Sequence, residues 1–474
     1  MPAIVEVRAM RTTIVIAIAS VALAGCASTA AERGWTNVSA IAEPVLGTKP
    51  VWIRSDEEAA EARRIVTGLL AQPIDADAAV RIALLNNRNL QVAYAELGIA
   101  ASDLAQATRL PNPGFSYARL SRPGELEIER EISLNLLNLL VLPVVQGIED
   151  RRFRQGQLAA AESLLRTAVE VRHAWVRAVA TQQAADYVAQ VKEAAESRAE
   201  MARRLNRAGN LSSLAYAREQ TFYAETAVQQ ARARREAAMA RERLVRLLGV
   251  WGEDAAFVLP LRLPELPATP RETADLERRA IEDRLDLRIA RLDIDGLARS
   301  LGLTRATRFV NVLEAGYLRN RESGKPLQDG YEIRLEIPLF DWGDAKVARA
   351  EFAYMGAVNR LAARAVAARS EVREAYLDYR IAFDIARQYR AEILPVRQHI
   401  SEEMLLRYNG MLVSIFELLA DVRDQIAAVT AALAAERDFW IADATLSYAT
   451  LVGTGSAMVS SPIGLPGAER APMH

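Results

Sequence analysis

The sequence has very few of the residues that bind metals or carry out covalent chemistry. It contains one cysteine and three histidines, His173, His399 and His474. No cysteines and histidines have the spacing of a zinc, iron–sulfur or haem site. Neither a glycine-rich phosphate-binding loop nor the turn of a nucleophilic serine is present. These absences argue against an enzyme and predict no cofactor and no bound metal.

Charge and hydropathy narrow the possible classes of protein further. Lysine plus arginine number 59 and aspartate plus glutamate 60, so nucleic acid is not an expected partner. The one long apolar run, residues 13–24, is too short for a helix that spans a bilayer. Any other insertion into a membrane therefore requires strands closed into a barrel.

The first residues resemble an export signal. Arg8 and Arg11 precede the apolar run, which ends in Leu-Ala-Gly-Cys at Cys26. This order predicts a signal peptide over 1–25, with Met1 or Met10 as the start. The four last residues are similar to a bacterial lipobox, so Cys26 is the expected site of lipidation, and Ala27 favours the outer membrane. The alternative is an ordinary signal peptide with a chance cysteine.

The rest of the chain is duplicated. Each half has an amphipathic helical stretch, a pair of short strands, a very long helix rich in alanine, arginine and glutamate, a break that contains glycine, and a returning helix. Repetition on this scale sets the architecture. The predicted divisions are an extended N-terminal arm over 26–74, a first repeat over 75–270, a second over 271–453 and a mobile tail over 454–474.

Proline positions give the expected helix boundaries. In the first repeat we expect a helix over 77–110, stopped by Pro111, and a long helical hairpin over 144–249. In the second we expect a helix over 271–307 and a hairpin over 343–453, kinked at Pro395. A helix of roughly 60 residues spans about 90 Å, so each long helix can lie beside two stacked partners.

The predicted strand pairs, 113–137 and 309–338, show an alternation of period two. In residues 126–136 one face is apolar except for Arg130, and the other holds Glu127, Glu129 and Glu131. Such strands suit a transmembrane barrel, and a soluble hairpin that covers a helical core is the alternative. Four strands are too few to close a barrel, so a membrane location would require an oligomer.

Both helix reversals carry a further motif. Residues 408–419 read Tyr-Asn-Gly-Met-Leu-Val-Ser-Ile-Phe-Glu-Leu-Leu, and residues 204–214 match them with Gly209 and Ser213 in the places of Gly410 and Ser414. Glycine at these places is expected to supply the positive φ of the reversal. In these features the chain resembles the TolC-like family of outer-membrane efflux proteins, in its lipoprotein branch.

The resemblance implies a mainly α fold with a small β part. Duplicated helical hairpins would form a periplasmic α-barrel, and four strands per chain would contribute to a 12-stranded transmembrane β-barrel in a homotrimer. The expected partners are outer-membrane lipid, a periplasmic adaptor (membrane fusion) protein and an inner-membrane pump of an efflux or type I secretion system. Drugs, metal cations and peptides are equal candidates for the cargo.

The resemblance also implies functional residues at the reversals. Glu417, Asp421 and Asp424 are the candidate periplasmic gate, although Ala420 stands where the family often has a second aspartate, and solvated surface charges are the alternative. The candidate adaptor contacts at the two tips are Arg204, Gly209, Ser213, Leu214, Arg407, Gly410, Ser414 and Ile415.

In the barrel interpretation the glutamate face lines the lumen. The candidate lumen residues are Glu127, Glu129, Glu131, Glu332, Arg334 and Glu336. Because acidic residues outnumber the arginine, this predicts a lumen that prefers cations. The leading function is thus an exit duct that conducts solutes passively. The alternative is a periplasmic helical scaffold that is held at the outer membrane only by its lipid anchor.

Overall fold

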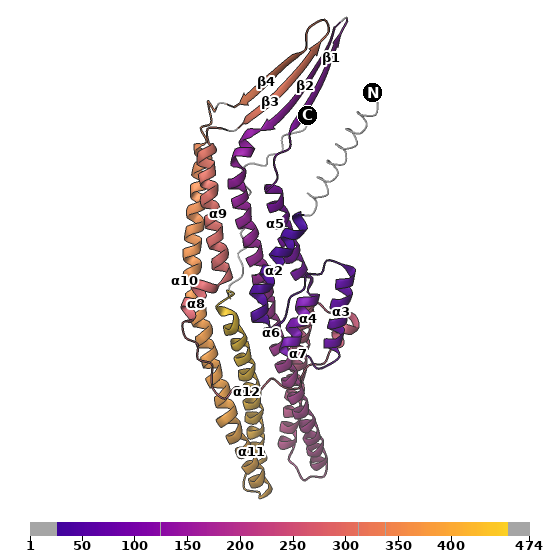
Figure 1. Ribbon diagram of the computed structural model, residues 1–474. Helices are drawn as coiled ribbons and strands as arrows, with labels where there is room; N and C mark the ends of the chain where they lie inside the picture. Colours follow the sequence, from indigo (N-terminus) through magenta and orange to yellow (C-terminus); the bar gives the residue numbers. More distant parts are fainter. Residues whose placement is uncertain (1–25, 124, 311, 337, 454–474) are drawn as a thin grey trace.

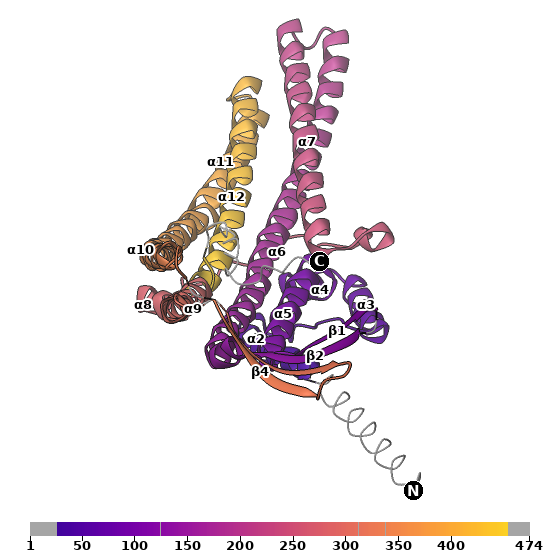
Figure 2. The same ribbon diagram turned by 90° about the horizontal axis from the view of Figure 1, so that it is seen from above.

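The computed structural model describes residues 26–453, apart from Gly124, Asn311 and Ile337. The predicted signal peptide and the predicted tail lie outside the described residues. The molecule is elongated, with a β-sheet at one end and two helical hairpins at the other (Figure 1). Seen from above, each hairpin is a pair of helices, and the two pairs stand apart along most of their length (Figure 2). The prediction of a mainly α fold with four strands is confirmed.

The first repeat has one continuous helix as its backbone. This helix, α6 (Leu136–Arg207), has 72 residues and would span about 108 Å. It packs against α4 (Ala76–Asn86) and α5 (Arg88–Ala107) on the sheet side, and against α7 (Ser213–Leu248) on the tip side. The prediction of one long helix beside stacked partners is therefore confirmed. A short 3-10 turn, η1 (Gly252–Ala256), follows α7.

The second repeat has the same plan with one irregularity. Its helices are α8 (Leu276–Asp283), α9 (Leu285–Thr307), α10 (Asp344–Gln388), α11 (Leu394–Asn409) and α12 (Ile415–Ala449). A π-helical turn, η2 (Tyr389–Ile393), joins α10 to α11 immediately before Pro395. Proline lacks an N–H and crowds the carbonyl four residues earlier, and a wider turn accommodates this without ending the helix.

The two opening helices, which we predicted to be continuous, are each broken. Residues 77–110 separate into α4 and α5 at Asn87, and residues 271–307 separate into α8 and α9 at Arg284. The end of the returning helix docks at each break. Asn86 Nδ2 donates to the Gly249 carbonyl at 2.6 Å, and Leu285 N–H donates to the Leu451 carbonyl at 3.0 Å. These bonds satisfy carbonyl groups that a helix terminus leaves free.

A buried arginine organises the second of these joints. The Arg284 side chain is 3% exposed and forms ion pairs with Asp286 at 2.8 Å and Glu371 at 2.7 Å. Asp286 belongs to α9 and Glu371 to α10, so Arg284 connects the break to the long helix. A planar guanidinium suits this double contact because it presents several N–H groups in one fixed plane.

The prediction of an extended N-terminal arm is wrong. Residues 26–74 contain two helices, α2 (Cys26–Leu46) and α3 (Asp56–Leu70). Val38, Ala42 and Leu46 recur every fourth residue on one face of α2, and all three are buried in the main core. The prolines in this stretch suggested irregular structure, but Pro44 fits within the last turn of α2.

The sheet has four antiparallel strands in the order β1-β2-β3-β4. They are β1 (Gly114–Arg122), β2 (Glu125–Asn135), β3 (Leu313–Glu322) and β4 (Gln328–Leu335). The sheet projects beyond the helices, and none of the described helices lies over either face (Figure 1). The alternative of a hairpin that covers a helical core is therefore wrong. None of the described helices is both long and apolar enough to cross a membrane.

The joint at Arg284 gives the first testable prediction. Arg284→Ala leaves two carboxylates without their shared cation, and we expect it to lower the free energy of unfolding by about 2 kcal/mol or more. Thermal unfolding followed by circular dichroism measures this. The control is Arg278→Ala, since Arg278 also contacts two carboxylates but is exposed on α8. Equal melting temperatures for the two variants would contradict the structural role of Arg284.

Candidate functional site: the sheet faces and the helical tips

The strand register sorts the glutamates of the sheet onto one face. Residues directly opposite one another in antiparallel strands point to the same side, and alternate residues point to opposite sides. Glu127 is opposite Leu120 and Glu322, and Ser133 is opposite Gly114 and Gly316, which is opposite Glu332. All seven strand glutamates share this face: Glu125, Glu127, Glu129, Glu131, Glu314, Glu322 and Glu332.

The predicted lumen residues are mostly brought together on this face. Arg334 lies there too, with ion pairs to Glu314 and Glu332, both at 3.1 Å. Glu127 accepts a hydrogen bond from Asn320 Nδ2 at 2.9 Å. Glu336 differs from the others, because it follows the end of β4. The acidic face is thus built by β2 together with the hairpin of β3 and β4, which lies almost 180 residues further along the chain.

The opposite face is divided along its length. Near the helices it carries apolar and aromatic side chains that are at least half exposed: Phe115, Ile132, Tyr317, Tyr331, Ile333 and Leu335. Nearer the hairpin ends it carries Arg119, Arg130, Arg319 and Arg321. In the sequence Arg130 is an isolated exception on an apolar face. The strand register, which the sequence does not give, places the other three arginines beside it.

The two tips use the same turn, but not at the residues that the motif matched. Ser212 caps α7 and Ser414 caps α12. Three residues before these caps stand Gly209, with φ of 77°, and Met411, with φ of 57°. Gly410 has φ of −80°, so the expectation of positive φ holds for Gly209 and is wrong for Gly410.

Backbone hydrogen bonds explain this shift of one residue. Asn210 N–H donates to the Leu205 carbonyl and closes the first turn, and Leu412 N–H donates to the Arg407 carbonyl and closes the second, both at 2.9 Å. In each case the residue before the donor takes the left-handed conformation. Helix α11 therefore continues one residue further than α6, and Met411 occupies the position that favours glycine.

The candidate adaptor residues differ in how available they are. Leu214 at the first tip is 61% exposed, and Arg204 is paired with Glu200 at 2.9 Å. Hydrogen bonds from Arg203 and Arg204 lower the pKa of Glu200 to about 2. At the second tip Ser414 is used as a helix cap, and Ile415 packs against the contact between the hairpins. Met411 and Leu412, which the prediction omitted, are 93% and 78% exposed.

Each candidate gate carboxylate has a partner within its own chain. Glu417 accepts hydrogen bonds from Ser414 N–H at 2.7 Å and Ser414 Oγ at 2.9 Å, and these bonds lower its pKa. Asp421 is 7% exposed and accepts a hydrogen bond from Ser401 Oγ at 2.7 Å. Asp424 is exposed and pairs with Arg397 at 3.2 Å. A gate ring of these residues stays a prediction.

A contact between the two hairpins near their tips was not foreseen. Phe222 of α7 packs with Leu419 of α12 and Ala195 of α6. Beside this cluster, Arg423 forms an ion pair with Glu225 at 2.9 Å and lies 5.6 Å from the ring centre of Phe222. We call Arg423, Glu225 and Phe222 the tip clasp. The sequence offered no signal for it, because its members are about 200 residues apart.

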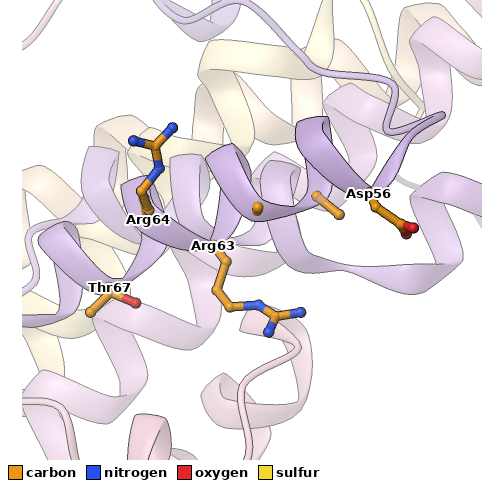
Figure 3. A pocket seen from close by; sticks show the side chains of 6 residues that line it. Asp56, Arg63, Arg64 and Thr67 are labelled. Carbon is orange, nitrogen blue, oxygen red and sulfur yellow. The ribbon is translucent and has the colours of Figure 1, made fainter.

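A histidine and a surface depression lie outside the sheet and the tips. Within the described ranges, no three cysteine, histidine or acidic side chains are close enough together to hold a metal ion. His173 lies between α6 and α12, where its Nε2 is 2.9 Å from Thr445 Oγ1 and burial lowers its pKa. A depression beside α3 is lined by Asp56, Arg63, Arg64 and Thr67 (Figure 3), with the arginines pointing apart.

Comparisons place this geometry among known folds. No family model matches the chain, and no curated protein matches it in sequence. Among solved structures, the outer-membrane channel OprN is 18% identical, with a TM-score of 0.65 over 86% of this chain and 95% of its own. The transmembrane channel CusC is 17% identical, with a TM-score of 0.66 over 80% and 92%. The MtrE channel of Neisseria gonorrhoeae is 16% identical, with a TM-score of 0.61 over 83% and 89%. The chain has the fold of TolC-like outer-membrane channels.

The two tip glycines provide a matched test. A Cβ at Gly209 meets no atom within 4 Å, so Gly209→Ala isolates the cost of positive φ, about 1 kcal/mol. Gly410→Ala should be nearly neutral because its φ is ordinary and its nearest contacts are at 3.5 Å or more. Amide hydrogen exchange at the first tip should therefore accelerate about five-fold in Gly209→Ala, whereas exchange at the second tip should be unchanged in Gly410→Ala. Equal acceleration in both variants would show that the turn assignment is wrong.

Proposed function

We propose that this protein is the outer-membrane exit duct of a tripartite efflux or type I secretion system. It would act as a homotrimer and conduct passively the solutes that an inner-membrane pump delivers. The observation that carries the proposal is the sheet, which projects from the helices with open edges, an exposed apolar face and an acidic face. Water would disfavour so large an exposed apolar surface, whereas lipid would accept it.

The edges of the sheet support an assembly of three chains. Strands β1 and β4 are its outer strands and leave rows of backbone groups unpaired within the described chain. These groups must be satisfied inside a bilayer, and pairing β1 of one copy with β4 of the next achieves this. Single-chain barrels begin at about eight strands, so two copies would give the minimum and three would give twelve. The resemblance to TolC-like channels favours three.

The helices also present a surface that suits contact between copies. On α10, large apolar side chains recur at helical spacing and are about half exposed or more: Phe352, Met355, Val366, Leu377, Ile381 and Ile385. A stripe of this kind normally packs against another helix. In a homotrimer it would lie against the next copy, and the helices would continue the barrel as a tall periplasmic conduit.

The tips are the proposed site of contact with a periplasmic adaptor protein. They lie at the end furthest from the sheet, and Leu214, Met411 and Leu412 offer exposed apolar side chains there. The predicted contacts Arg204, Arg407 and their neighbours stay part of this proposal. Lipidation of Cys26, at the first residue of α2, would hold the trimer at the outer membrane.

A scaffold without transport activity is the competing function. It would explain the long helices, and it would require only the lipid anchor. It would leave the exposed apolar face and the open edges of the sheet without a purpose, and this favours the duct. Among the described side chains, no group of three or more cysteine, histidine or acidic residues could hold a metal ion for an enzymatic role.

Bilayer conductance tests the duct directly. Purified protein should have the native mass of a trimer, slightly below three times the 52.1 kDa of the full sequence because the predicted signal peptide is removed. It should give cation-selective current steps. Replacing Glu127, Glu129 and Glu131 together by glutamine would remove nine carboxylates from the trimer. We expect the ratio of cation to anion permeability to fall about two-fold or more, read from reversal potentials.

The matched control neutralises three exposed carboxylates of α3, in the variant Asp56→Asn, Glu57→Gln and Glu61→Gln. It should leave the reversal potential unchanged, because α3 lies outside the proposed conduit. A monomer that gives no current and leaves the membrane fraction when its anchor is removed would favour the scaffold. Anion selectivity of the unaltered protein would overturn the acidic lumen.

The tip clasp predicts a change in gating. An exposed ion pair contributes about 0.2–1 kcal/mol, so its loss should shift an opening equilibrium about two-fold per copy. Arg423→Ala should therefore increase the mean current of the channel, and Glu225→Gln should do the same. Arg203→Ala serves as the control, since its ion pair with Glu200 lies within one helix. Unchanged current in both clasp variants would separate this contact from gating.

A further inference from the structure

The four arginines on the apolar side of the sheet form a compact group. Arg130 of β2 is directly opposite Arg319 of β3, and Ile128 lies between Arg119 of β1 and Arg321 of β3 in the next row on that face. Neighbouring strands are about 4.8 Å apart, and successive rows on one face are about 7 Å apart. We name Arg119, Arg130, Arg319 and Arg321 the arginine patch.

The charge of the patch is poorly compensated within the chain. Asp329 pairs with Arg319 at 3.5 Å and is the one acidic residue of the four strands on this face. Among the described residues, Arg119, Arg130 and Arg321 have no ion-pair partner. Like charges directly opposite one another destabilise a strand pair. The arrangement therefore calls for an anion from outside the chain.

The position of the patch identifies the kind of anion. The rows below it, towards the helices, are uncharged and include Phe115, Ile132 and Tyr331. Below these rows Phe309 and Trp342 meet edge to face at 6.3 Å, and Phe340 is 99% exposed. Aromatic residues mark the border of the apolar band in membrane barrels. A ligand that follows this face would have apolar chains beside its lower half and a negative headgroup at the arginines.

The order of features along this face agrees with an apolar band between two borders. Strand β3 begins at Leu313, a short distance after Phe309, and contains Arg319 and Arg321. The aromatic pair therefore lies beyond the helix-side end of the strand, and the arginines lie towards its hairpin end. The helices lie on the aromatic side. If they are periplasmic, the patch faces the outer leaflet.

We propose that the arginine patch binds a phosphorylated glycolipid of the outer leaflet, with its phosphates on the guanidinium groups and its acyl chains on the apolar rows. Guanidinium groups form paired hydrogen bonds with phosphate oxygens, and they tolerate partial burial better than lysine. Several arginines within about 10 Å of one another match a headgroup that carries two phosphates. This inference rests on the proposed membrane location of the sheet.

Native mass spectrometry of the full-length trimer with purified lipid A tests the proposal. The variant Arg119→Gln, Arg130→Gln and Arg321→Gln should lose at least about ten-fold in retained lipid A. The control Arg122→Gln with Arg334→Gln removes two arginines from the opposite face of the same strands, and it should bind as the unaltered protein does. Dephosphorylated lipid A with the same acyl chains should bind weakly to all three proteins.

Specific outcomes overturn the inference. Undiminished binding by the triple variant, or an equal loss in the control, would mean that the patch is not the site. Equal retention of phosphatidylglycerol would show a general anionic lipid, and displacement by inorganic phosphate alone would show a free anion site. If the triple variant does not trimerise, Arg321→Gln alone must still weaken binding. A conducting trimer that retains no lipid A would contradict only this inference. A protein without conductance would also contradict the proposed function as an exit duct.

Discussion

The joint between each returning helix and the start of its own repeat is the contact on which the tall shape depends. A continuous helix such as α6 can extend the full length of the molecule, but its neighbours must be stacked end to end. The stack holds because Asn86 and Asn87 bond the last carbonyls at the end of α7, and because the Leu285 N–H bonds the Leu451 carbonyl just after α12. Arg284 reinforces the second joint through its ion pair with Glu371 of α10. Without these joints the opening and returning helices of each repeat would no longer be held end to end beside the long helix.

Periodicity carried most of the correct expectations. The alternation in β2 and β4 identified both strand pairs, and proline placed the interruption near Pro395. What periodicity missed depends on tertiary contacts. The amphipathic pattern continues through Asn87 and Arg284, although the end of a distant helix is bonded at each break. At the first break Asn87 also caps the start of α5. The N-terminal helices were missed because prolines outweighed the four-residue spacing of Val38, Ala42 and Leu46.

The tips show how a motif can be correct in kind and displaced in position. Both turns close with the same backbone bond, yet the second places Met411 rather than Gly410 in the left-handed conformation. The acidic residues nearby were recognisable as a group, but their roles were not. The capping bond of Glu417, the burial of Asp421 and the clasp at Arg423 each depend on a partner that only the folded chain supplies.

The sorting of charges across the sheet has a consequence for fidelity of assembly. A slip of one residue in any strand would exchange its two faces, since side chains alternate with a period of two. For β4 such a slip would turn Glu332 and Arg334 towards the apolar rows and Tyr331 and Ile333 towards the glutamates. For β2 the same slip would turn Glu127, Glu129 and Glu131 towards the apolar rows. The sheet thus discriminates against its own misaligned forms. If its edges pair with identical copies, as proposed, the same sorting provides a check on the alignment between chains.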